Sequence, residues 1–145
     1  MFHRMRLCFA LAGLLVLYPG GAGAVPSSDT SPGAPLQQRG SELRTAAAAE
    51  YKRLEKSGTL QRGSDVTGLV QKYIPAGTSF DDAKAVLRAA GCRIGMTIHG
   101  NVLGDVRLGG GIASGVSLVI ELAPKAPGDF TVVDKVSASI IVQYS

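Results

Sequence analysis

The sequence predicts an α+β fold in which a helical hairpin packs on one face of an antiparallel sheet of three or four strands, as a two-layer sandwich. Apolar residues recur at the helical period of about 3.6 as far as Ala90, and from Cys92 they alternate with the period of 2 typical of half-buried strands. The helical patterns all precede the strand patterns, which favours segregated layers over a wound βαβ sheet.

Residues 1–24 have the pattern of a secretory signal peptide. A basic start precedes the apolar run 7–18, and Ala22-Gly23-Ala24 forms a small-x-small cleavage site. The run is shorter than the about 20 residues that a membrane-spanning helix needs. We therefore expect cleavage after Ala24, export to the periplasm or the medium, and no transmembrane span once the signal is removed.

The next two segments are predicted as a tether and a first helix. Residues 25–40 are rich in Pro, Ser and Gly, which favours a disordered linker. Residues 41–145 then form one small α+β domain. Within it, residues 41–58 have a helical pattern whose apolar stripe is thin and rich in alanine, so we expect this helix to be loosely attached or to contact a partner.

The second predicted helix spans residues 66–74. Asp65 can accept a hydrogen bond at its start, and Pro75 ends it. A five-residue turn then leads to a third helix over residues 80–90. Because the turn is short, we expect these two helices to form the antiparallel pair that covers the sheet.

The helix of residues 80–90 has a readable start and end. Thr78 or Ser79 can cap its first turn, and two aspartates after Ser79 place negative charge at the positive end of the helix dipole. Gly91 suits the left-handed position that follows the last helical residue. Cys92 then falls where a Schellman ending returns a side chain against Leu87.

Four strand patterns follow. They span residues 92–99, 102–108, 116–122 and 130–142, with a tight turn at Gly100-Asn101. Asp134 interrupts the alternation of the last strand and predicts a bulge or a bend. In the first strand, the pattern places Met96 and Ile98 on the same face as Cys92.

Charge and cysteine content exclude some classes of function. The chain has 15 basic and 11 acidic residues, and removal of residues 1–24 takes away Arg4 and Arg6, leaving 13 − 11 = +2. This balance, without a Lys or Arg run, does not favour nucleic-acid binding. Cys8 leaves with the signal peptide, so Cys92 is alone in the exported chain and no intramolecular disulfide is expected.

A nucleophilic site would need Cys92 and His99, with Asp105 as an orienting group. In a strand spanning residues 92–99, Cys92 and His99 have opposite parity and point to opposite faces of the sheet. We therefore interpret Cys92 as a small buried residue beside Leu87. The sequence predicts no catalytic residues, and the protein is not expected to be an enzyme.

Binding motifs for ions and cofactors are also missing from the sequence. Cys92 and His99 are too few soft ligands for a zinc site. The cluster Gly109–Gly115 lacks the Lys-Ser/Thr of a P-loop and precedes a strand pattern, so we interpret it as a flexible hairpin loop that can still carry contacts. Asp81 and Asp82 point about 100° apart on a helix and suit its start better than acid–base catalysis. No metal or cofactor is predicted.

Gly77 and Thr78 precede the helix of residues 80–90, Leu87 lies on its apolar face, Gly91 follows it, and strand patterns come next. In these four residues and in the order of the elements, residues 65–142 resemble the small outer-membrane assembly lipoproteins of the SmpA/OmlA type and the related repeat of the β-lactamase inhibitor protein. The resemblance implies a helical hairpin followed by a three-stranded antiparallel sheet, in a protein that binds other proteins. No cysteine at the cleavage site could accept a lipid, so a lipid anchor is not predicted.

These observations predict an exported, non-catalytic protein that binds another envelope or secreted protein. One alternative is an inhibitor or immunity-type protein that blocks another protein's active site through the Gly109–Gly115 loop. A second, from another class, is a hydrolase that uses Cys92. The sequence does not specify the partner, its contact residues or the oligomeric state.

Overall fold

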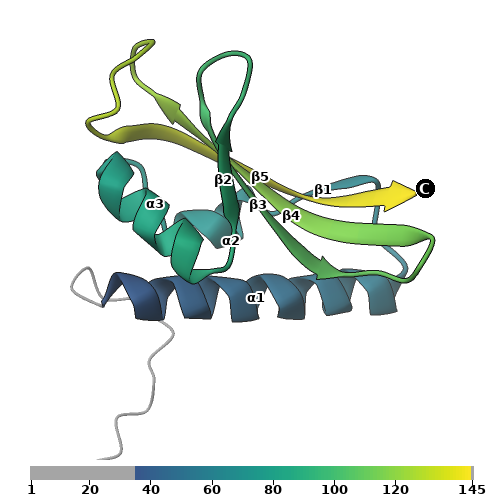
Figure 1. The fold of residues 1–145 in the computed structure, drawn as a ribbon. Coiled ribbons are helices and arrows are strands. Elements are labelled where there is room, and N and C mark those ends of the chain that lie inside the picture. The colour runs from purple at the N-terminus through teal and green to yellow at the C-terminus, as the bar shows by residue number, and fades with distance from the viewer. Residues whose placement is uncertain (1–34, 145) are drawn as a thin grey trace, which may run out of the picture.

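The computed structural model describes residues 35–144, which form three helices and five strands. In chain order these are α1 (Leu36–Ser57), β1 (Gly63–Asp65), α2 (Thr67–Gln71), α3 (Phe80–Ala89), β2 (Arg93–Met96), β3 (Val102–Gly109), β4 (Ser114–Pro124) and β5 (Val133–Tyr144) (Figure 1). The predicted signal peptide and residues 25–34 of the predicted linker lie outside the described residues. Within the described residues, no helix is long and apolar enough to cross a membrane.

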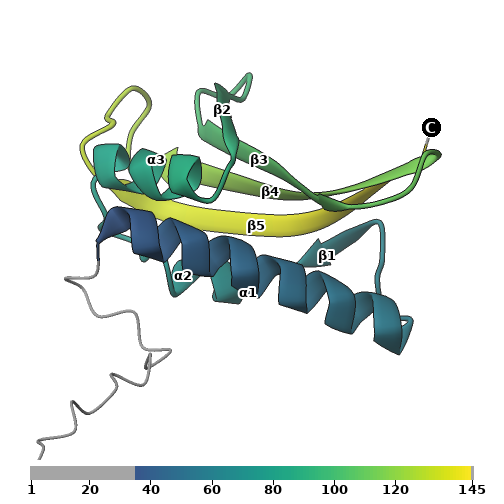
Figure 2. The same ribbon diagram turned by 60° about the horizontal axis from the view of Figure 1, so that its bottom comes forward.

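The helices and the sheet form separate layers, which confirms the α+β class. Figures 1 and 2 both show α1, α2 and α3 on one side of the sheet. On that inner face, alternate side chains of the long central strands are buried, including Leu118 and Ile120 of β4 and Ile140 of β5, each with 0% exposure. The other face carries no helix from residues 35–144.

The predicted number of strands is too low, because the described sheet has five strands in the order β1-β5-β4-β3-β2, all antiparallel. The missed strand is β1, whose sequence Gly-Ser-Asp has no apolar alternation. It pairs Gly63 with Ile141 and Asp65 with Ser139. β5 is long enough to pair with β1 as well as with β4. β1 therefore forms through a long-range contact that its own sequence does not indicate.

The predicted helical hairpin is also wrong, because α3 packs mainly on α1. The α1–α3 approach is close at Gly40, where an added Cβ would lie 2.5 Å from the carbonyl oxygen of Val86. The much shorter α2 packs instead on β5, where the amide of Ala138 donates to Thr67 Oγ1 at 2.9 Å. Helix pairing is therefore set by where backbones can approach and not by the length of the connecting turn.

The first helix begins earlier and packs more closely than predicted. It starts at Leu36, so residues 36–40 of the predicted linker are helical. Leu43 and Ala47 are buried, and Arg39 donates from Nη2 to the carbonyl oxygen of Tyr73 at 2.6 Å. A loose attachment is therefore excluded. The sequence did not indicate the early start of α1, because Arg39 and Gly40 are residue types common in linkers, although both are buried in the fold.

The two ends of α3 confirm the prediction. Ser79 Oγ accepts a hydrogen bond from the amide of Asp82 at 3.1 Å. Gly91 adopts a φ of 82°, and the amide of Cys92 donates to the carbonyl oxygen of Leu87 at 2.9 Å, as in a Schellman ending. The start of α3 is also tied to the sheet, because the amide of Phe80 donates to the carbonyl oxygen of Thr131.

The central strands match their predicted ranges closely, and the bulge at Asp134 is confirmed. Ala123 pairs with Lys135 and Pro124 with Val133, which leaves Asp134 as the extra residue. The last predicted strand begins later than expected, because residues 130–132 lie in the loop before β5. In that loop, Phe130 packs edge-on against Phe80, with ring centroids 5.2 Å apart.

The strand predicted over residues 92–99 is shorter in the structure, where it is β2. β2 ends at Met96, which is 61% exposed, and Ile98 lies in the following turn with 97% exposure. The amide of Thr97 donates to the carbonyl oxygen of Asn101 at 2.8 Å, so the turn closes before Ile98 could extend the strand. Met96 thus keeps the predicted face of the strand but is not covered, and the predicted position of Ile98 in this strand is wrong.

Candidate binding groove

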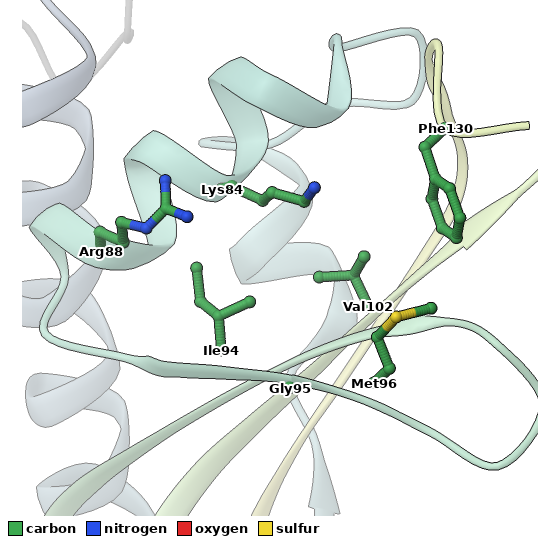
Figure 3. Close-up of a pocket in the computed structure, with 7 residues that line it drawn as sticks. All are labelled: Lys84, Arg88, Ile94, Gly95, Met96, Val102 and Phe130. Atoms are coloured by element: carbon green, nitrogen blue, oxygen red, sulfur yellow. The ribbon is translucent and has the colours of Figure 1, made fainter.

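A groove of about 330 Å³ lies between α3 and the β2–β3 hairpin (Figure 3). Its lining comes from three parts of the chain, namely α3, the hairpin and the loop before β5. The lining residues are Lys84, Arg88, Ile94, Gly95, Met96, Val102 and Phe130. We call this site the α3–β2 groove.

The groove exists because α3 sits close to β3 on one side and the hairpin projects beyond the core on the other. A Cβ added at Gly104 would lie 3.0 Å from Leu87 Cδ1, so the missing side chain lets α3 rest directly on β3. Gly104 pairs with Ile94, and the next inward-facing pair is Val102 with Met96. Figure 1 shows the tip of the hairpin projecting away from the helices.

The floor of the groove is apolar. Val102 is buried and Ile94 is half-buried, whereas Met96 beside them is largely exposed. Phe130 forms one wall and is held by its edge-on contact with Phe80. Ile98, two residues after Met96 in the turn at the hairpin tip, is almost fully exposed.

Two cations line the opposite wall. Lys84 and Arg88 are one turn apart on α3, and Lys84 Nζ lies 6.0 Å from the centroid of the Phe130 ring. Within residues 35–144, no ion pair joins either side chain to a carboxylate. The groove lining also contains no acidic residue. The site therefore combines an apolar floor with two positive charges.

The predicted nucleophile candidates do not form a site. Cys92 is buried at the start of β2, whereas His99 is exposed in the turn at the other end of the hairpin. Burial raises the pKa of the Cys92 thiol from 9.0 to about 11, with a smaller contribution from the charge of Asp105. Asp105 instead pairs with Arg93 Nη2 at 3.1 Å. A thiol with this pKa is largely protonated near neutral pH and is a poor nucleophile.

The other candidates have structural positions. Gly109 and Gly115 belong to β3 and β4, so the predicted loop is reduced to residues 110–113, with Ile112 fully exposed at its tip. Asp81 and Asp82 are exposed at the start of α3. Among residues 35–144, no group of three or more His, Cys, Asp or Glu side chains could hold a metal ion.

The open face of the sheet is mixed in character. One row across it places the charged Asp105 beside Val119 and then Ser139. The next row places Leu103 beside Glu121 and then Ser137. Apolar and polar side chains thus alternate, and the face offers no continuous apolar patch. The α3–β2 groove is the stronger candidate for a contact surface.

Sequence reasoning missed the groove for two reasons. Lys84 and Arg88 fall on the polar face of the helix of residues 80–90, and the alternation of the strand pattern places Met96 and Ile98 on the same face as the buried Cys92. The useful signal was the turn chemistry of residues 97–101, which limits the preceding strand to four residues. A strand that ends at Met96 leaves Ile98 outside the sheet.

Comparison of the chain with protein-family models, with curated proteins and with solved structures finds no match.

Proposed function

We propose that this chain is an exported, non-catalytic protein that binds another envelope or secreted protein through the α3–β2 groove and the adjoining hairpin tip. The exposure of Met96 and Ile98 beside an apolar groove carries the proposal. Large apolar side chains that are exposed together in this way mark interaction surfaces in soluble proteins. Burial of a Met or Ile side chain in a complex contributes roughly 1.5–3 kcal/mol to binding.

The export part of the proposal rests on the sequence of residues 1–24, with cleavage after Ala24. The resemblance to the SmpA/OmlA-type proteins agrees with a role in protein binding and stays a prediction. The proposal for the groove does not depend on it, because the groove residues are not the ones that carry the resemblance.

An inhibitor or immunity-type role through the glycine-rich turn is the second candidate. Ile112 is fully exposed at the tip of residues 110–113, between β3 and β4. A tip of this kind can insert into a cavity of another protein. A hydrolase that uses Cys92 has no comparable support, because the thiol is buried and has a raised pKa.

Site-specific photo-crosslinking distinguishes the first two candidates. A photoreactive amino acid is placed at position 98 or, as the matched control, at position 112, and the protein is produced in its own organism. We expect a discrete adduct of defined mass from position 98 and none from position 112. An adduct from position 112 alone would favour the inhibitor-type role, and the absence of adducts from both positions would overturn binding at either tip.

A further inference from the structure

We infer that the groove takes an extended, acidic segment of the partner, which adds to the free edge of β2. This inference rests on the proposed function and names the chemistry of the partner. An apolar side chain of the segment occupies the groove floor, and its carboxylates lie beside Lys84 and Arg88.

The edge position of β2 is the first support. In the strand order of the described residues, β2 ends the sheet and has a neighbour on one side only, β3. Backbone N–H and C=O groups along such an edge are a template for another strand. Gly95 lies inside β2 and is exposed, and it has no side chain that could hinder a second backbone at this edge.

The other edge of the sheet is less suited to a partner. β1 has only three residues, and the residues before it, Gln61 and Arg62, are exposed and polar. The α3–β2 groove, by contrast, lies beside β2 at the opposite edge of the sheet. The two edges therefore differ in the surface that the side chains of an added strand would contact, and only the β2 edge adjoins the α3–β2 groove.

The alternation of an added strand fits the groove. Ile94 and Met96 have their side chains on the inner face of β2, as shown by their pairing with Gly104 and Val102. Every second side chain of an added strand would lie on that same face, next to Met96. The groove thus supplies specificity for an apolar residue, while the edge supplies backbone hydrogen bonds.

Charge selects an acidic segment. Figure 3 shows Lys84 and Arg88 extending from α3 on the side of the groove that faces β2. Since no carboxylate lines the groove or pairs with these two residues in the described part of the chain, their charge is available to a partner. A carboxylate beside them gains charge-assisted hydrogen bonds, whereas a Lys or Arg there meets like charge.

The test uses the full chain labelled with ¹⁵N and two capped hexapeptides, Thr-Val-Thr-Glu-Thr-Glu and Thr-Val-Thr-Lys-Thr-Lys, in which the Val and both charged side chains lie on the same face of the extended chain. We expect the acidic peptide to cause saturable shifts of amide signals in residues 93–98 and 84–88. The basic peptide should bind at least about tenfold more weakly. A copy of the acidic peptide with N-methylated backbone nitrogens should not bind, because it cannot donate to the edge of β2.

Charge variants complete the test. Lys84→Glu with Arg88→Glu should weaken the acidic peptide at least about tenfold and reverse the preference, and Lys84→Gln with Arg88→Gln should give a smaller loss. Lys52→Glu with Lys56→Glu on α1 makes the same change in net charge away from the groove and should leave binding unchanged. The ¹⁵N spectra of all variants report whether the fold is retained.

Two results would overturn the inference. One is equal binding of the acidic and basic peptides, and the other is the absence of saturable shifts in residues 93–98. If position 98 crosslinks to a partner but the acidic peptide fails to bind, the proposed function stands and the extended acidic segment is refuted. If no adduct forms at position 98 while the peptide binds, the peptide site holds and the proposed cellular role fails.

Discussion

Replacement of Gly40 by alanine sets helix propensity directly against packing. Gly40 lies inside α1, where alanine is more favourable than glycine by about 1 kcal/mol. However, a Cβ at this position would lie 2.5 Å from the carbonyl oxygen of Val86 and would overlap the Cβ of Ala89 on α3. Because part of the obstacle is backbone, the two helices have to move apart.

The packing loss outweighs the gain in propensity. Overpacking of a core costs about 1–3 kcal/mol, and the rigid obstacle at Gly40 places the cost near the upper end, about 3 kcal/mol. Subtracting a propensity gain of about 1 kcal/mol leaves a net loss of about 2 kcal/mol in the free energy of unfolding. At a urea m-value of about 1.5 kcal/mol/M, the unfolding midpoint should fall by about 1.3 M.

Gly68→Ala is the matched control. Gly68 is also helical, in α2, but an added Cβ meets no atom within 4 Å. Propensity therefore acts alone, and this variant should gain about 1 kcal/mol in the free energy of unfolding. Urea titration followed by circular dichroism measures both variants. A Gly40→Ala midpoint equal to or above that of the unchanged protein would refute the close α1–α3 contact.

Two further predictions concern Ser79 and Cys92. Ser79→Ala should lower the free energy of unfolding by about 1 kcal/mol through loss of the cap on the Asp82 amide, and Ser79→Asp should restore most of it in the same urea titration; equal losses in both variants would contradict the capping role. In a Cys8→Ser background, Cys92 should react with iodoacetamide about 100-fold more slowly in the folded protein than in urea at pH 8, because a pKa of about 11 in place of 9.0 reduces the thiolate fraction by that factor. The raised pKa also means that the unfolded state loses this proton first, so the stability contributed by the neutral thiol is complete below pH 9 and is lost between about pH 9 and 11. Cys92→Ala should flatten this part of the profile of stability against pH, and a folded-state alkylation rate close to that in urea would contradict the burial of the thiol.

Local signals predicted the parts of the fold that depend on neighbouring residues. The cap at Ser79 and the left-handed Gly91 are properties of one short segment, and both are in the structure as expected. The bulge at Asp134 was visible because a single residue broke a period of 2. These features depend on backbone geometry within a few residues, which the sequence carries directly.

The parts that were mispredicted depend on contacts between distant segments. β1 has no strand pattern of its own and forms only because Gly63 and Asp65 pair with the far end of β5. The α1–α3 contact depends on Gly40, which composition alone suggested was part of a linker. Neither pairing leaves a periodic signal in the sequence.

The groove was missed for the same reason. Lys84 and Arg88 fall on the polar face of an amphipathic helix, and only the position of the β2–β3 hairpin brings that face to an apolar floor. Met96 alternates correctly for a core position, yet the strand ends beyond the cover of α3. The proposed binding surface thus lies at a junction of three segments, and no single segment predicts it.

The affinity of the partner identified by crosslinking tests the central claim most directly. Met96→Ser with Ile98→Ser removes the exposed apolar surface of the hairpin, while Ile112→Ser makes a comparable change at the other tip. Because these side chains are largely exposed, both variants should keep their urea midpoints. We predict that the double variant binds the partner at least about 30-fold more weakly, a loss of about 2 kcal/mol, and that Ile112→Ser binds it unchanged. Unchanged affinity of the double variant would contradict the assignment of the α3–β2 groove and its hairpin as the binding surface.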